Sequence, residues 1–245
     1  MRRVLFHWHG VKIYSYPAML YLGLVFGVVA GNYAANLAGL NSARVFVATL
    51  LLLIPALIGA RLLFVGSHWE IYRREPRRIW RRSEGGAALY GGLPLSLLAS
   101  VPLLGALQVP FGAFWDVATF TILVGMIFGR FGCLLHGCCS GRPTEGRFAL
   151  CLANHQGTWQ RRIPTQLLEA GWAAVLLAGA VAFWDQMPFP GALFLYALAG
   201  YGLGRFVLES TREEQDKVGK ITIHRLISAV LLGLSLTTLG IGWMS

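Results

Sequence analysis

Apolar and polar residues follow one another along this chain in long blocks. A helix needs about 20 consecutive apolar residues to cross the roughly 30 Å hydrocarbon core of a bilayer. The pattern therefore predicts an all-α fold, a polytopic membrane protein built as a bundle of about seven transmembrane helices with short loops. The apolar blocks that define these helices cover residues 17–38, 44–66, 87–106, 113–135, 165–185, 189–209 and 222–243.

The polar segments between the blocks are short except at 67–86 and 136–164. The first block follows Met1-Arg2-Arg3, a start that is also typical of signal peptides. It continues past Gly31, however, without the short apolar region and the small-residue cleavage site of a signal peptide. We expect the first block to be a retained helix and residues 1–245 to form a single transmembrane domain.

Basic residues lie almost entirely on one side of the predicted bundle. Only 13% of the residues are charged, yet the net charge is +10, and among the loop residues only Arg44 falls on the side away from the N-terminus. The positive-inside rule therefore predicts that the N-terminus and the longer loops are cytoplasmic and that the C-terminus is outside. We interpret these loops as contacts to anionic lipid headgroups, and expect no nucleic-acid partner because no nucleic-acid module accompanies them.

Three arginines, Arg61, Arg130 and Arg205, lie inside or at the end of apolar blocks. An arginine within the bilayer costs about 2.5 kcal/mol or more, so it normally faces the bundle interior or a wet cavity and has a partner. All three lie toward the basic ends of their helices, which predicts that they converge on one pocket at headgroup depth. For Arg61 the alternative is a side chain that extends to the interface by itself.

The predicted sixth helix carries Tyr201, Arg205 and Glu209 at i, i+4 and i+8, on one helical face. A structural ion pair would explain Arg205 and Glu209 equally well. Around Arg130, three glycines allow a ligand or another backbone to approach closely. These are Gly129, Gly132 and Gly137.

The segment "EGGAALYGGL" at 84–93 places four glycines at the start of the predicted third helix. Their backbone N–H groups, together with the helix dipole, favour an anion. A guanidinium group binds phosphate through two parallel hydrogen bonds. The arginines and this segment together predict a phosphate-bearing amphiphile as ligand. The glycines are Gly85, Gly86, Gly91 and Gly92.

The order of several motifs resembles the bacterial prolipoprotein diacylglyceryl transferase family over most of the chain. The motifs are "GAR" (59–61), "EGGAALYGGL" (84–93), Asp116, "GRFG" (129–132), "GR" (141–142), "PTQLLEA" (164–170) and "YGLGRFVLESTR" (201–212). The resemblance implies an enzyme of the bacterial inner membrane that moves a diacylglyceryl group from phosphatidylglycerol to the thiol of a lipobox cysteine and releases glycerol phosphate. It implies no cofactor.

The family's functional residues carry over at several positions. By resemblance, Arg130 and Arg205 match its two essential arginines, which grip the phosphate. Tyr16, Gly141 and Glu209 match its tyrosine in the first span, its motif glycine and its late acidic residue. Neutralising the charge of a leaving phosphate is the chemistry that such a displacement requires. Gln166 and Glu169, in "PTQLLEA", are expected to line the headgroup cavity.

This chain also departs from the family pattern. Tyr90-Gly91-Gly92 stands where the family has His-Gly-Gly, so the proposed general base is missing at its usual place. In "GCLLHGC", Cys133 and His136 replace asparagines and Cys138 replaces a glutamate. The orientation differs as well, because the family's active side faces outward whereas the charge distribution here predicts a cytoplasmic one.

These replacements suggest which residues act as base and as nucleophile. An imidazole suits proton transfer at neutral pH, which makes His136 the predicted base. Cys138, close in sequence to Arg130 and Arg142, is predicted to have a lowered pKa and to act as a nucleophile, unless the incoming substrate does so. The alternatives are a zinc site, although the C-x2-H-x-C-C spacing is unusual for one, and cysteines that only fill gaps around a glycine turn.

Together these observations predict a transferase that acts on an anionic phospholipid within the membrane, with phosphatidylglycerol and possibly a prolipoprotein signal peptide as its partners. The alternatives are a cytoplasm-facing transferase with another acceptor and an inactive lipid-binding protein. The predicted catalytic residues are Arg130, Arg205, His136, Cys138 and Tyr90. The predicted substrate-binding residues are Tyr16, Arg61, Gly91, Gly92, Gly141, Arg142, Gln166, Glu169, Tyr201 and Glu209.

Overall fold

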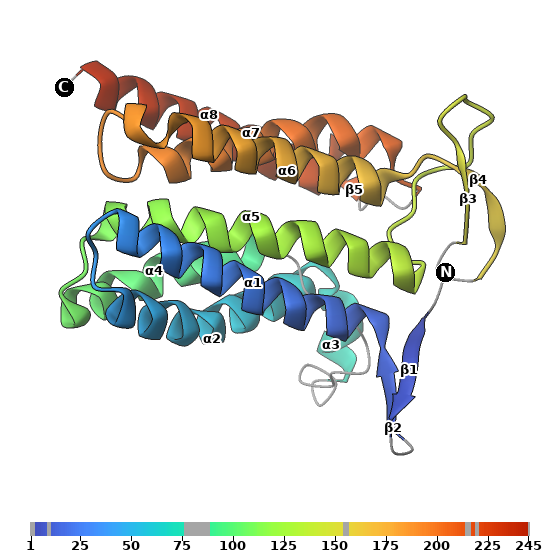
Figure 1. Ribbon diagram of the computed structural model, residues 1–245. Helices are drawn as coiled ribbons and strands as arrows, with labels where there is room; N and C mark the ends of the chain where they lie inside the picture. The colour runs from blue at the N-terminus through green and yellow to red at the C-terminus, as the bar shows by residue number, and fades with distance from the viewer. Residues whose placement is uncertain are drawn as a thin grey trace. The chain divides into compact units, whose positions relative to one another are not determined.

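The computed structural model describes residues 3–8, 11–75, 89–153, 157–213, 217–218 and 221–244. Helices make up most of these residues (Figure 1). The helices are α1 (Ser15–Leu37), α2 (Ser42–Ser67), the short α3 (Trp69–Arg74), α4 (Leu89–Leu107), α5 (Phe111–His136), α6 (Thr165–Phe183), α7 (Ala192–Leu208) and α8 (Ile223–Met244).

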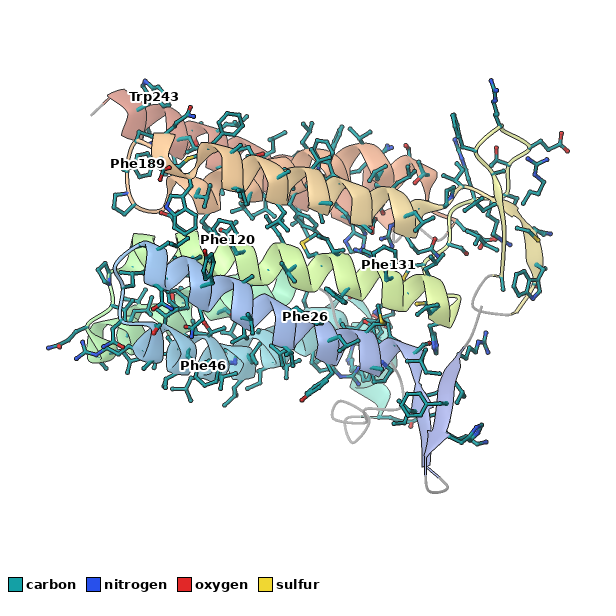
Figure 2. All side chains as sticks on the ribbon, viewed as in Figure 1. Phe26, Phe46, Phe120, Phe131, Phe189 and Trp243 are labelled. Carbon is teal, nitrogen blue, oxygen red and sulfur yellow. The ribbon has the colours of Figure 1, made fainter. Side chains whose placement is uncertain are left out.

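The prediction of an all-α membrane bundle is confirmed. Within the described residues, six helices are long and apolar enough to cross a membrane, and α4 adds a shorter apolar helix at Gly91–Leu107. Each of the seven predicted blocks corresponds to one of these helices. Large apolar side chains such as Phe46 and Trp243, exposed to 41% and 74%, point away from the helices (Figure 2). Such exposure suits a surface that faces lipid rather than water.

Among the residues that the structure describes, three antiparallel hairpins lie in polar segments, where the sequence pattern predicted only loops. β1 (Val4–Trp8) pairs with β2 (Val11–Tyr14), β3 (Leu150–Ala153) with β4 (Trp159–Arg162), and β5 (Lys217–Val218) with β6 (Ile221–Thr222). In the second hairpin Leu150 faces Arg162 and Ala153 faces Trp159. Strands of two to five residues are too short to stand out in a hydropathy pattern.

The described contacts divide the chain into two units, 1–34 with 115–245 and 35–114. The prediction of a single domain therefore stays a prediction. In the first unit, glycines of α1 let α5 approach closely: a Cβ atom on Gly27 would lie 2.7 Å from the carbonyl oxygen of Thr121. Helices in lipid associate through such small residues because they have no hydrophobic effect between them.

Similar contacts join the other helices of the first unit. Trp172 on α6 donates a hydrogen bond from Nε1 to the carbonyl of Gly200 on α7, 2.8 Å away. Asp116 on α5 accepts hydrogen bonds from the backbone N–H groups of Gly191 and Phe194 at 2.6 and 3.0 Å, which caps the first turn of α7. The Asp116 contacts join the beginnings of α5 and α7, and the Trp172 contact joins α6 to α7, so together they fix how the three helices pack.

In the second unit, α2 packs against α4 through glycine. A Cβ on Gly59 would collide with the carbonyl oxygen of Gly91, and one on Gly92 would lie 2.7 Å from that of Ala56. Packing of two helices thus accounts for Gly91 and Gly92. Their predicted role in binding an anion stays a prediction, and Gly85 and Gly86 lie outside the described residues.

Candidate active site at the polar end of the first unit

Glu169, in the second turn of α6, is the centre of a buried cluster of charges. Its carboxylate pairs with three arginines from other elements. Oε2 lies 2.6 Å from Nε of Arg130 on α5, and Oε1 lies 2.9 Å from Nη1 of Arg205 on α7 and 2.7 Å from Nη2 of Arg212. Glu169 is 7% exposed, so these pairs form largely away from water.

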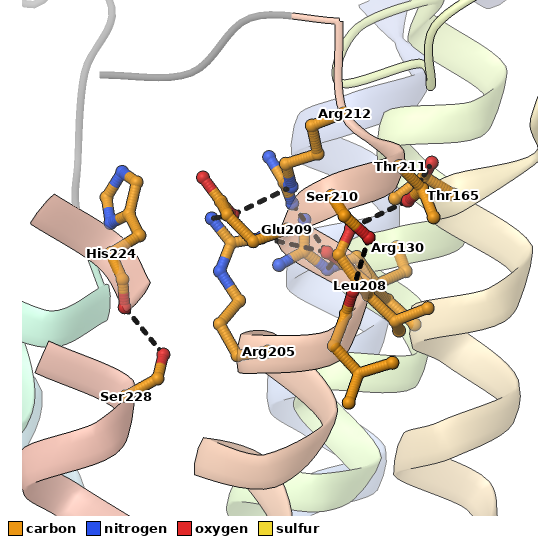
Figure 3. A network of polar contacts seen from close by, with 12 residues as sticks. Arg130, Thr165, Arg205, Leu208, Glu209, Ser210, Thr211, Arg212, His224 and Ser228 are labelled. Atoms are coloured by element: carbon orange, nitrogen blue, oxygen red, sulfur yellow. Dashed lines mark hydrogen bonds and ion pairs between the residues drawn. The ribbon is translucent and has the colours of Figure 1, made fainter. Parts of the chain in front are cut away.

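Glu209 is the second carboxylate of the cluster. It follows α7 in the single 3-10 turn η4 (Glu209–Thr211), and its side chain is completely buried. Oε2 lies 3.1 Å from Nη2 of Arg205 and 3.8 Å from Nε of Arg212. Figure 3 shows Arg205, Glu209 and Arg212 side by side at this end of α7, with Arg130 behind them. The predicted alignment of Arg205 and Glu209 along one helical face is confirmed.

The cluster holds more positive than negative charge. Three guanidinium groups face two carboxylates, which leaves one net positive charge among these five buried or half-buried side chains. Buried charge is costly unless it is paired, so the surplus favours an anion. The ion pair of Arg130 with Glu169 uses only Nε, and the Arg130 side chain is 19% exposed. Its two Nη groups are the donors best placed for a phosphate.

The turn after α5 is fixed against the ends of α6 and α7. Gln166 donates a hydrogen bond from Nε2 to the carbonyl of Cys138, 2.8 Å away. The backbone N–H of Gly141 donates to Ile163 at 3.1 Å, and that of Arg142 donates to Thr211 at 2.9 Å. Gly141 also forms a β-bridge with Arg212, so the turn helps to position Arg212 for Glu169.

Only glycine fits at position 141. An added Cβ would lie 2.5 Å from both the carbonyl oxygen of Ile163 and Oγ1 of Thr165. The side chain of Arg142, by contrast, is exposed. The backbone of this pair therefore has a clear structural role, and substrate binding by either residue stays a prediction.

Arg162 supports the same turn and was not predicted from the sequence. Its side chain is 1% exposed, and it forms an ion pair with Glu213 at 2.7 Å. It also donates to the carbonyl of Gly141 at 3.3 Å and to Oε1 of Gln160 at 3.0 Å. We interpreted it from the sequence as one of several basic loop residues. No local sequence pattern marks Arg162 as buried: β4 was not predicted, and its other three residues are all exposed.

Tyr16 and His136 lie at the same end of the first unit, on α1 and α5. Their ring centroids are 6.1 Å apart, and Gly132 makes room for the ring of Tyr16. The carbonyl of His136 accepts a hydrogen bond from Nε of Arg3 at 3.3 Å. Nδ1 of His136 is buried and has no hydrogen-bond partner among the described residues. The role of His136 as a base stays a prediction.

Cys133, Cys138 and Cys139 form a cluster beside these residues. Their three sulfur atoms lie within 4.8 Å of one another. Cys133 is buried, Cys138 is half-buried and Cys139 is exposed, and all are free thiols. Cys151 is a free thiol too, but it lies on strand β3 outside the cluster.

The ionisation of these thiols differs from the prediction. Hydrogen bonds to Cys133 and Cys139, followed by burial, raise the pKa of Cys138. Hydrogen bonds from Cys133 and Cys138 lower the pKa of Cys139, and the charges of Arg212 and Arg130 act in the same direction. The expected low pKa of Cys138 is therefore wrong, and the lowered pKa belongs to its neighbour Cys139.

Arg61 lies in the second unit. Its guanidinium carbon is 5.5 Å from the ring centroids of both Phe64 and Tyr72, and Nη2 donates to the Tyr72 hydroxyl at 3.4 Å. Arg130 and Arg205 do converge as predicted, whereas convergence of Arg61 with them stays a prediction. Tyr90 lies in the first turn of α4, and its side chain is outside what the structure describes.

Sequence reasoning missed Arg212 as a member of the charge cluster. We counted it among the basic loop residues that set topology. It comes three residues after Glu209, a spacing that places two side chains on one face of a helical turn. That spacing, together with its place at the end of the motif "YGLGRFVLESTR", is the signal that was available. Tyr201 lies one helical turn before Arg205 and interacts with it electrostatically, and its role in substrate binding stays a prediction.

These features define a polytopic membrane protein with a cationic cluster at one end of its helices. The chain matches the prolipoprotein diacylglyceryl transferase family over residues 3–241 and belongs to that family. It is a membrane transferase, as the resemblance predicted.

Named relatives match the chain along nearly its whole length. The chain is 28% identical over 244 residues to the phosphatidylglycerol–prolipoprotein diacylglyceryl transferase of Clostridium botulinum (strain Hall), which covers 96% of this chain and 95% of that protein. The corresponding protein of Trichormus variabilis is 26% identical over 245 residues, or 96% of this chain and 86% of that protein.

Proposed function

We propose that this protein transfers the diacylglyceryl group of phosphatidylglycerol to the cysteine thiol of a prolipoprotein signal peptide, in the inner membrane of a bacterium. The observation that carries the proposal is the charge cluster, in which three arginines surround two carboxylates. Its surplus positive charge at one end of the helices suits a phosphodiester that enters laterally from the bilayer. Family membership and the names of the relatives supply the donor and the acceptor.

Arg130 is the residue we assign to the phosphate. Its Nη groups remain available while Nε holds Glu169 at 2.6 Å. Arg205, 7% exposed and paired with both carboxylates, fixes the position of the cluster. As the carbon–oxygen bond on the diacylglyceryl side breaks, negative charge develops on the glycerol phosphate that leaves. Donors already in place stabilise that charge without reorganisation.

The acceptor thiol must lose its proton to attack. We assign this proton to His136, which ends α5 six residues after Arg130 and has a buried Nδ1 without a hydrogen-bond partner among the described residues. The sulfur then forms a thioether with the lipid carbon. A cysteine of the enzyme itself would form an equally stable thioether and would not turn over, so the attacking thiol belongs to the acceptor rather than to Cys138.

The test is mass spectrometry of a lipobox peptide after incubation with purified protein and phosphatidylglycerol. We expect a diacylglyceryl peptide, and about 100-fold less of it with Arg130→Ala. Arg147→Ala is the matched control, because Arg147 is an exposed arginine of the neighbouring polar segment. Phosphatidylglycerol consumed without a peptide product would indicate another acceptor. Lipid binding without consumption would indicate an inactive lipid-binding protein.

Transfer to a translocated prolipoprotein and transfer to a cytoplasmic acceptor require the site on opposite sides of the membrane. Cys151 is an exposed native thiol on the β3–β4 hairpin and reports that side. We expect a membrane-impermeant maleimide to label Cys151 in intact spheroplasts if the acceptor is a translocated prolipoprotein. Labelling only after the membrane is opened would favour the cytoplasmic orientation that the charge distribution predicts.

A further inference from the structure

The cysteine cluster is not needed to hold phosphate, and the transfer described above leaves it without a task. We propose that Cys133, Cys138 and Cys139 bind a zinc-type metal ion and leave one coordination position for the thiol of the acceptor. The second part of this proposal rests on the proposed transfer. The metal site itself does not.

The three sulfur atoms already lie close to the geometry that zinc requires. They lie within 4.8 Å of one another. Zinc binds thiolates at about 2.3 Å, which places two sulfurs of a tetrahedral site roughly 3.8 Å apart. A contraction of about 1 Å or less, within the reach of cysteine side-chain rotation, therefore closes the site around the ion.

The backbone is shaped to bring the three thiols together. The N–H groups of Gly137 and Cys138 both donate to the carbonyl of Cys133, at 3.0 and 3.1 Å. The chain then turns through two left-handed residues, Gly137 (φ 83°) and Cys139 (φ 58°). A left-handed conformation is unfavourable for a residue with a Cβ. At Cys139 it turns the side chain back toward Cys133 and Cys138, which is a reason for the strain to persist.

The site is also held from outside and is open on one side. Gln166, 1% exposed, fixes the carbonyl of Cys138. Cys133 is buried at the base of the cluster, while Cys139 is exposed at its rim. Three protein ligands with one accessible position are the pattern of catalytic rather than structural zinc. Arg130 and Arg212 lie close enough to interact with Cys139 electrostatically, which places the cysteine cluster next to the charge cluster.

The accessible position explains how this chain manages with Tyr90 where its family has a histidine. A thiol that coordinates zinc gives up its proton, which passes to solvent or to His136. The sulfur uses a lone pair to form the new bond to the lipid carbon. The carbon–oxygen bond breaks, and its electron pair leaves with the glycerol phosphate. No oxidant or reductant is required, and the metal keeps its charge.

The first experiment measures metal binding by the full-length protein in detergent under reducing conditions. Cobalt(II) is the probe, because thiolate ligands give it a charge-transfer absorption in the near ultraviolet, and zinc is then used to displace it. We expect one cobalt per chain and full displacement by zinc. Cys138→Ser and Cys139→Ser should each weaken binding at least tenfold, whereas Cys151→Ser, the matched control, should bind as the unchanged protein does.

Several results would overturn the metal site. These are no thiolate-to-cobalt absorption, equal binding by Cys138→Ser and the unchanged protein, or binding of copper(I) but not of zinc. A disulfide within the cluster in protein purified without reductant, with no metal bound after its reduction, would show a redox pair instead.

The second experiment tests the open position. A lipobox peptide added to cobalt-loaded protein should shift the absorption, and the same peptide with serine in place of its cysteine should not. In the transfer assay, removal of the metal should lower the product at least tenfold, and zinc should restore it. Full activity without metal would overturn the catalytic part and leave the proposed transfer intact. If no product forms with or without metal, the proposed transfer is contradicted. The cobalt-binding experiment still tests the metal site, because it does not depend on transfer.

Discussion

Arg205 and Arg61 both lie in apolar helices, and the two units hold them differently. Arg205 on α7 is 7% exposed and forms ion pairs with Glu169 and Glu209. Arg61 on α2 is half-buried and contacts the rings of Phe64 and Tyr72 together with the Tyr72 hydroxyl. Arg205 belongs to a network of opposite charges, whereas the contacts described for Arg61 include two aromatic rings and a hydroxyl group.

The difference shows what an intramembrane arginine alone can and cannot indicate. Aromatic rings stabilise a guanidinium by about 0.5–2 kcal/mol and demand little of its geometry. A buried carboxylate fixes its partner, and breaking the pair is costly because a charge stays behind. The paired arginines therefore carry the positional accuracy that a reaction needs. We expect substitutions in the charge cluster to matter far more than those at Arg61.

The largest effect is expected from Glu169→Gln. It removes the carboxylate shared by Arg130, Arg205 and Arg212, and so leaves three cations around one remaining acid. Loss of one member of a buried ion-pair network costs about 3–5 kcal/mol. Thermal unfolding in detergent should show a clearly lower midpoint, and the peptide assay should show loss of transfer. Glu145→Gln, an exposed acid of the adjacent turn, should change neither, and an unchanged midpoint for Glu169→Gln would contradict the network.

Arg205→Lys comes next and separates geometry from charge. A lysine ammonium keeps the charge but cannot span Glu169 and Glu209, which bind separate guanidinium nitrogens of Arg205. We expect about a 100-fold loss of transfer, equivalent to about 2.7 kcal/mol of transition-state stabilisation. Kinetic constants from the peptide assay would show it. Wild-type turnover in this variant would mean that charge alone suffices.

Gly141→Ala should have an intermediate effect on the cluster without removing a charge. Its new Cβ would lie 2.5 Å from the carbonyl oxygen of Ile163 and from Oγ1 of Thr165, and such overpacking costs about 1–3 kcal/mol. Thermal unfolding would measure the loss. In Gly146→Ala the nearest atom is Oγ1 of Thr144 at 3.4 Å, so that variant should remain as stable as the unchanged protein.

Arg61→Lys should have the smallest effect. A lysine can contact the rings of Phe64 and Tyr72 in place of the guanidinium, and the weaker cation–π contact costs about 0.5–1 kcal/mol. Transfer should stay within about threefold of the unchanged protein, a change of less than about 0.7 kcal/mol in barrier height. A loss as large as that of Arg205→Lys would show that Arg61 also grips the phosphate, and would remove the contrast between the two arginines.

The sequence predicted several parts of the site correctly for local reasons. The seven helices follow from blocks of apolar residues, and Arg205 and Glu209 share a face because they are four residues apart in one helix. The central place of Glu169 was not accessible in this way. Arg205 and Arg212 follow Glu169 by 36 and 43 residues, and Arg130 lies on α5. No local spacing in the sequence relates these arginines to Glu169.

Hydropathy and helical periodicity by themselves determined that this chain spans the membrane with about seven helices, and where most of them begin and end, because transfer of a helix into lipid depends on its own residues. The tertiary structure decided which charges are shared, that Arg162 and Arg212 point inward, and that three thiols lie together. Those contacts depend on how α5, α6, α7 and the turn after α5 pack, and helix packing joins residues that the order of the chain keeps apart.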